Sequence, residues 1–70
     1  MTMTPILQIL AYEKCRIEPD GRIVYPDPLG RASVAMAIED EYGIEEITED
    51  EAEQCVTVDD WEMLVKAKTG

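Results

Sequence analysis

Few side chains in this sequence have the types and spacing that covalent or metal chemistry requires. Cys15 and Cys55 lie far apart, form no C-x-x-C or zinc-type pattern, and have no histidine beside them to complete a metal site. We expect neither thiol to be an activated nucleophile, and we expect the carboxylates to be surface charge. The sequence therefore predicts a protein that is not an enzyme and that binds no metal.

The same two cysteines also bear on the cellular compartment in which the protein is expected to be found. We expect a structural pair of buried thiols, although the sequence leaves a disulfide between Cys15 and Cys55 open. We recognise no cleavable signal segment before the domain and no apolar run that approaches the length of a membrane span. A reducing, cytoplasmic setting is therefore the expectation.

Charge is distributed unevenly along the 70 residues. The chain has 16 acidic and 6 basic side chains, a formal charge of -10, and no Lys or Arg within residues 32–65. Such a balance disfavours nucleic acid and anionic membranes and favours a protein partner with a basic surface. The acidic block is either a solvated helical surface or a docking face for that partner. The length allows one domain, residues 1–70, which we expect to be a monomer.

Local signals predict the first helix and the loop after it. Thr4 and Pro5 are a typical N-cap and first helical residue, and they predict a helix of about three turns ending near Cys15. Residues 18–28 contain three of the four prolines and predict a long loop. Residues 22–25 could pair with residues 15–17 as a hairpin, but an isolated hairpin is marginal. The predicted fold is therefore all-α.

The second helix has the strongest signals in the sequence. Asp27 and Pro28 repeat the cap-then-proline pattern, and Gly43 supplies a stop. The apolar residues that recur every four positions are Val34, Ile38 and Tyr42. Acids lie between them, so this helix is predicted to be amphipathic with an acidic outer side.

Two capping boxes predict the remaining helices. Thr48 and Glu51 form the first box, which predicts a short helix through about Gln54. Thr57 and Asp60 form the second box. The helix that follows it has the spacing Val58, Trp61, Leu64 or Val65, and Lys68, which is predicted to lay one apolar stripe against the bundle. The complete pattern predicts a small four-helix bundle with one short third helix and a long first loop.

The segment that begins at Asp27 resembles acyl carrier proteins. Residues 27–42, DPLGRASVAMAIEDEY, align without a gap with the family's D-S-L-D-x-V-E-L-V-M-A-L-E-E-E-F. The identical positions are Asp27, Leu29, Met36, Ala37, Glu39 and Glu41. Residues 47–58, ITEDEAEQCVTV, are similar to the family's I-P-D-E-E-A-E-K-I-T-T-V. The resemblance implies that residues 1–70 form one acyl-carrier-like domain.

The resemblance stops at the residue that carries the family's chemistry. In acyl carrier proteins the Ser after this Asp bears 4'-phosphopantetheine, whose thiol holds the acyl chain. Here that position is Pro28, which has no hydroxyl. Ser33 lies more than one helical turn later and projects in another direction, so it is not expected to act as a substitute. We therefore expect no prosthetic group and no other cofactor.

The family's surface for recognising partners is only partly kept. Two acids that the family uses there are replaced by Gly30 and Ser33. The residues that remain, and that the resemblance implies as partner contacts, are Leu29, Met36, Glu39, Asp40 and Ile47. The sequence leaves open whether Met36 lies on the surface or in the core.

These features predict an acyl carrier protein-like, non-enzymatic binding or adaptor protein that docks on a basic partner without carrying a group. Two alternatives stay open. The chain could be a divergent acyl carrier that is loaded at Ser33 or at a cysteine. It could also be an acidic inhibitor that mimics the charge of nucleic acid.

Overall fold

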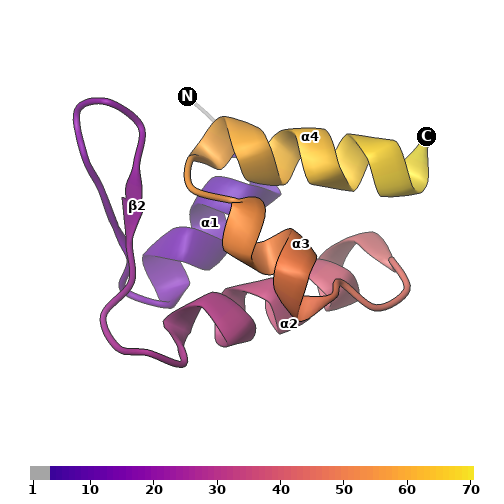
Figure 1. Cartoon of the computed structure of the whole chain (residues 1–70), viewed down its shortest axis with the longest axis horizontal. Helices are drawn as coiled ribbons and strands as arrows, with labels where there is room; N and C mark the ends of the chain where they lie inside the picture. The colour runs from indigo at the N-terminus through magenta and orange to yellow at the C-terminus, as the bar shows by residue number, and fades with distance from the viewer. Residues whose placement is uncertain (1–3) are drawn as a thin grey trace.

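The computed structural model describes residues 4–70, and within them the chain forms four helices and one short hairpin. The elements are α1 (Pro5–Tyr12), β1 (Arg16–Ile17), β2 (Ile23–Val24), α2 (Gly30–Tyr42), α3 (Glu49–Gln54) and α4 (Val58–Thr69). The helix α1 packs on α2 and α4, α3 packs on α2, and the hairpin projects from one side (Figure 1). The predicted mostly helical bundle with a short third helix is confirmed.

The first helix begins where the sequence predicts and ends earlier. Thr4 caps the first turn with its hydroxyl. At the other end, the Cys15 N–H donates to the Leu10 carbonyl at 2.9 Å, and Lys14 adopts a φ of 63°. This is a Schellman arrangement, in which Lys14 takes the left-handed position that glycine usually fills. It ends α1 at Tyr12 rather than near Cys15.

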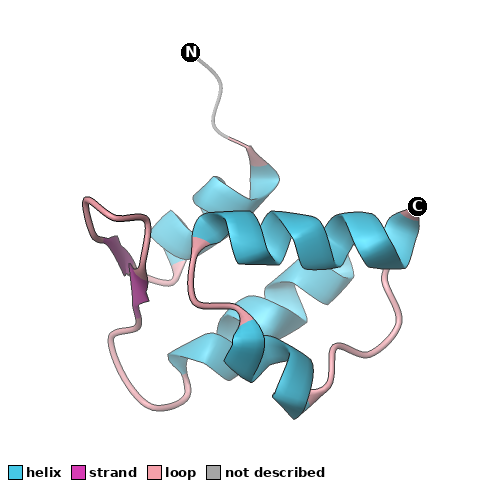
Figure 2. Ribbon diagram, turned by 45° about the horizontal axis from the view of Figure 1, so that its top comes forward, coloured by secondary structure: helices cyan, strands magenta, loops and turns pink. Residues whose placement is uncertain are grey.

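The hairpin corrects the all-α prediction. The strands β1 and β2 pair antiparallel and are shown in magenta in Figure 2. The Ile23 N–H donates to the Val56 carbonyl at 2.9 Å, and Arg22 forms a bridge with Thr57. Because the segment before α4 lies along β2 and Ile23 is buried, this hairpin has the tertiary support that an isolated hairpin lacks.

The start of α2 also differs from the prediction. The Asp27 carboxylate accepts a hydrogen bond from the Leu29 N–H at 2.9 Å, and its carbonyl accepts one from the Gly30 N–H at 3.0 Å. These bonds close a turn over residues 27–30, whose second position suits the fixed φ of Pro28. The prediction that Pro28 is the first helical residue is therefore wrong, and α2 begins at Gly30. Its end at Gly43 is as predicted.

Both predicted capping boxes are present, Thr48 with Glu51 at α3 and Thr57 with Asp60 at α4. The Thr48 N–H donates to the Glu51 carboxylate and, with the Lys68 ammonium, holds its pKa below the usual value. Backbone N–H groups before α4 lower the pKa of Asp60 in the same way. The predicted starts of α3 and α4 are confirmed.

The hydrophobic core lies among α1, α2 and α4. Trp61 is fully buried, and its indole N–H donates to the Tyr25 hydroxyl at 3.1 Å, which connects the loop before α2 to α4. Val34 and Ile38 are buried as predicted, and Tyr42 is half-buried. The other fully buried large side chains are Ile6 and Leu10. Residues 4–70 contain no helix with the length and apolar character needed to cross a membrane.

Candidate functional site

A groove of about 350 Å³ lies between α2 and α3. Its floor is apolar and is made by the buried side chains of Ala35, Ile47 and Ala52. Its rims carry Leu29 and Met36, whose exposed fractions are 73% and 67%. Exposed apolar rims beside an apolar floor give this groove a surface that a partner can cover.

Four of the five predicted partner contacts line this groove. They are Leu29, Met36, Glu39 and Ile47. Asp40 is exposed but is not among the residues that line it. The structure also places Met36 on the surface, which the sequence left open. The predicted residues therefore gather at one place, with Asp40 outside the groove.

Ile47, which the resemblance implies as a partner contact, is buried in the structure. Its side chain is 7% exposed and belongs to the hydrophobic core. Its N–H donates to the Glu39 carboxylate at 2.7 Å, so the loop before α3 is pinned against α2. Glu39 is consequently engaged within the chain rather than free to meet a basic partner. Both residues shape the groove, and Leu29 and Met36 present the accessible apolar surface.

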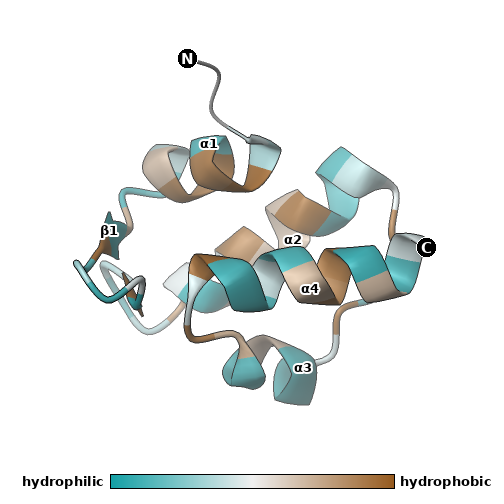
Figure 3. Ribbon diagram, turned by 90° about the horizontal axis from the view of Figure 1, so that it is seen from above, coloured by the Kyte–Doolittle hydropathy of each residue, from teal (hydrophilic) through white to brown (hydrophobic). Residues whose placement is uncertain are grey.

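An ion pair that the sequence did not predict joins the two sides of the groove. Arg31 of α2 lines the groove, and its guanidinium lies 3.8 Å from the Glu53 carboxylate of α3. The other positions of α3 are mostly hydrophilic, as its teal colour in Figure 3 shows. Because the two residues come from different helices, only the packing of α3 on α2 brings them together.

The attachment position of acyl carrier proteins lies at this same groove. Pro28 occupies it and lines the groove, so the chain offers no hydroxyl there. Ser33 is half-buried on α2 and is not among the lining residues. A group carried on Ser33 would therefore start from a different place than one carried on residue 28.

Both thiols are free and protonated at neutral pH. Cys55 is buried, and this burial, with nearby carboxylates adding to it, raises its pKa to about 11. Cys15 is half-buried, and burial followed by two nearby carboxylates raises its pKa as well. The basic neighbours Lys14 and Arg16 in the sequence do not reverse this direction. Neither cysteine has the lowered pKa that a reactive thiol needs.

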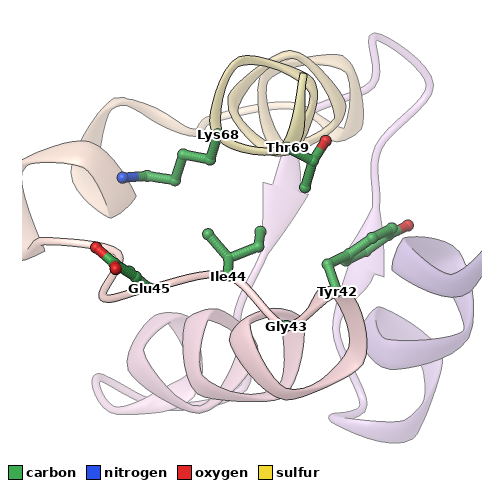
Figure 4. A pocket seen from close by; sticks show the side chains of 6 residues that line it. All are labelled: Tyr42, Gly43, Ile44, Glu45, Lys68 and Thr69. Atoms are coloured by element: carbon green, nitrogen blue, oxygen red, sulfur yellow. The ribbon is translucent and has the colours of Figure 1, made fainter.

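A second hollow, of about 480 Å³, lies between the loop after α2 and the end of α4 (Figure 4). Its cation is already engaged, because Lys68 lies 3.1 Å from the Glu51 carboxylate and donates to the Glu46 carbonyl at 3.5 Å. The large apolar side chains that line it are Tyr42 and Ile44, and both are half-buried. This hollow is therefore a seam between the loop after α2 and the end of α4, and it has no exposed apolar rim like that of the groove.

Four further large apolar side chains are exposed outside the groove, namely Tyr12, Ile17, Val56 and Met63, and two of them are mostly exposed. Tyr12 on α1 is 84% exposed, and Met63 on α4 is 69% exposed. Sequence reasoning did not single them out, although Met63 falls off the apolar stripe through Trp61 and Val65. Met63 matches Met36 in type and exposure, and so provides an internal control for the groove.

Comparison with known proteins identifies no relative: no family model matches the chain, and neither a curated protein nor a solved structure matches it. The resemblance to acyl carrier proteins consequently rests on the sequence of residues 27 to about 65.

Proposed function

We propose that this chain is a non-enzymatic, acyl carrier protein-like binding protein that docks a partner on the groove between α2 and α3. The observation that carries the proposal is the exposure of Leu29 and Met36 beside a buried apolar floor. Covering a large apolar side chain fully contributes about 1.5–3 kcal/mol, so two of them at one groove supply a useful anchor. The rest of the chain serves to hold this groove in shape.

Charge supports a basic protein as the partner. Residues 32–65, which supply eight of the eleven residues that line the groove, contain no Lys or Arg, and the whole chain carries a formal charge of -10. A second copy of the chain would bring like charges together, which supports a monomer. A basic surface on the partner would instead speed the encounter and fix its orientation.

The absence of a prosthetic group is part of the proposal. Pro28 has no hydroxyl to accept phosphopantetheine, and the turn over residues 27–30 suits a proline at that position. Ser33 lies outside the groove lining, and Cys15 and Cys55 are protonated thiols. We place the protein in the reducing cytoplasm, where free thiols persist.

Intact mass measurement tests this part of the proposal. The chain is coexpressed with a phosphopantetheinyl transferase of broad specificity, and a serine-bearing acyl carrier protein serves as the positive control. We expect the unmodified mass, because residue 28 offers no acceptor oxygen. A phosphopantetheine adduct would contradict the proposal and support the divergent carrier alternative.

Capture with matched variants tests the docking surface. Wild type, Met36→Ala and Met63→Ala are immobilised, and proteins retained from the source organism's lysate are quantified by mass spectrometry. We expect a protein with a basic surface to be retained by wild type and Met63→Ala and to be lost from Met36→Ala, because only Met36 lines the groove. Equal retention by Met36→Ala would overturn the docking surface. If Met36→Ala retains the partner as well as wild type does, and added salt abolishes this retention, the result would support the nucleic-acid mimic.

A further inference from the structure

The pair of Arg31 and Glu53 links α2 to α3 beside the groove. Arg31 lies in the first turn of α2, and its guanidinium lies 3.8 Å from the Glu53 carboxylate of α3. Arg31 is the one cationic side chain among the described residues that line the groove. Glu53 is not among the lining residues, but its carboxylate already has an internal cationic partner in Arg31, which does line the groove.

The ion pair between Arg31 and Glu53 is weak. A distance of 3.8 Å exceeds the length of an N–H···O hydrogen bond, so the two groups attract only as charges. Their side chains are 39% and 52% exposed, and exposed ion pairs contribute little to stability. Opening the pair therefore costs little, and an incoming cation can replace Arg31.

The spacing of the apolar rims indicates the shape of the ligand. Met36 lies seven residues after Leu29, which corresponds to about 10 Å along a helix axis. A partner helix of about two turns covers that length and presents apolar side chains on one face. Glu49 in the groove lining and Glu53 beside it complement cations that flank the apolar face of such a helix.

Resting on the docking function proposed above, we propose that the groove binds a basic amphipathic helix of the partner and that a cation of this helix displaces Arg31 from Glu53. The apolar face of the helix covers Leu29 and Met36, and its Lys or Arg takes the Glu53 carboxylate. Arg31 is thus an internal competitor that the ligand must replace. A purely apolar segment gains nothing from Glu53 and is selected against.

A synthetic peptide tests the displacement. The probe is a fluorescent amphipathic helix of lysine and leucine about 15 residues long, because shorter helices are marginal in water. Its affinity for the folded chain is measured by fluorescence polarisation. A scrambled peptide of the same composition reports binding by charge alone.

We expect Arg31→Gln to bind the amphipathic peptide about two- to fivefold more tightly than wild type, because the competitor is gone. Arg22→Gln makes the same change in net charge on the exposed hairpin and serves as the control. In a Glu53→Gln background, Arg31→Gln should raise the affinity for the peptide no more than Arg22→Gln does, since the carboxylate for which Arg31 and the peptide compete has been removed.

Two results separate failure of the displacement from failure of the docking surface. Suppose that peptide binding depends on Met36 but that Arg31→Gln raises the affinity no more than Arg22→Gln does, or raises it equally in the Glu53→Gln background. The displacement of Arg31 is then overturned, while the groove remains the docking surface. If binding is unchanged in Met36→Ala, or equal for the scrambled peptide, the docking surface is overturned and the displacement with it.

Discussion

Two basic side chains form ion pairs with acids of α3, one from α4 and one from α2, and the two pairs differ in distance and exposure. Lys68 of α4 lies 3.1 Å from Glu51, whose carboxylate also belongs to the capping box of α3. Arg31 of α2 lies 3.8 Å from Glu53, and its side chain is more exposed. The first contact joins α3 to α4 within the bundle, whereas the second lies beside a groove with exposed apolar rims. The comparison teaches that one side of α3 serves the fold and the other stays accessible to a partner.

The largest effect should separate the floor of the groove from its rim. Ile47→Ala removes a buried side chain, and we expect it to lower the free energy of unfolding by about 2–4 kcal/mol. Met36→Ala removes an exposed side chain and should change it by less than about 0.5 kcal/mol. Urea denaturation followed by Trp61 fluorescence measures both. A comparable loss in Met36→Ala would mean that Met36 is packed and that the groove has no free rim.

A smaller effect is expected at the fixed end of α3. Thr48→Ala removes the hydroxyl that caps the helix and should lower the free energy of unfolding by about 1 kcal/mol. Gln54→Ala, at the exposed far end of the same helix, is the control and should change it by less than about 0.5 kcal/mol. Equal effects in the same urea assay would show that the capping box does not hold α3.

Local chemistry explains why some of the fold was predictable from sequence. Thr4, Thr48 and Thr57 each bond within their own first turn, so their signals do not depend on the rest of the chain. Asp27 was misread because its carboxylate closes a turn with Leu29 instead of capping a helix. Both arrangements use the same side-chain chemistry within three residues, and the sequence does not distinguish them.

Contacts between distant segments account for what the sequence could not predict. The hairpin depends on Val56, which lies far along the chain from Ile23. The burial of Ile47 depends on how the loop before α3 folds onto α2. Leu29 and Met36, by contrast, lie close in sequence, at the turn before α2 and on α2 itself, and both line the groove. The resemblance thus pointed to Leu29 and Met36, but the sequence did not predict the exposure of Met36, the burial of Ile47 or the ion pair beside the groove.

Matched charge removals compare the two cations directly. Lys68→Gln and Arg31→Gln make the same change in net charge. We expect Lys68→Gln to lower the free energy of unfolding by about 0.5–1 kcal/mol, because its contact is short and less exposed. Arg31→Gln should change it by less than about 0.5 kcal/mol. A larger loss in Arg31→Gln would reverse the comparison and make the groove side the structural one.

The pH dependence of Glu51 gives the smallest effect. Its pKa is lowered in the folded chain by the Thr48 N–H and then by Lys68, so its contribution is complete above the unfolded pKa. This contribution is lost as the pH falls through the folded value. The stability difference between wild type and Glu51→Gln should therefore be constant near about pH 7 and shrink below about pH 4. A difference that stays constant to about pH 3 would contradict the charge-based role of Glu51.

The docking groove can be tested most directly by methyl NMR on the intact chain with isotope-labelled methionines. Met36 and Met63 are exposed to similar extents, but only Met36 lines the groove. On titration with the amphipathic lysine–leucine peptide, the account predicts that the Met36 methyl signal shifts and the Met63 methyl signal does not. A shift at Met63 with no change at Met36 would contradict it.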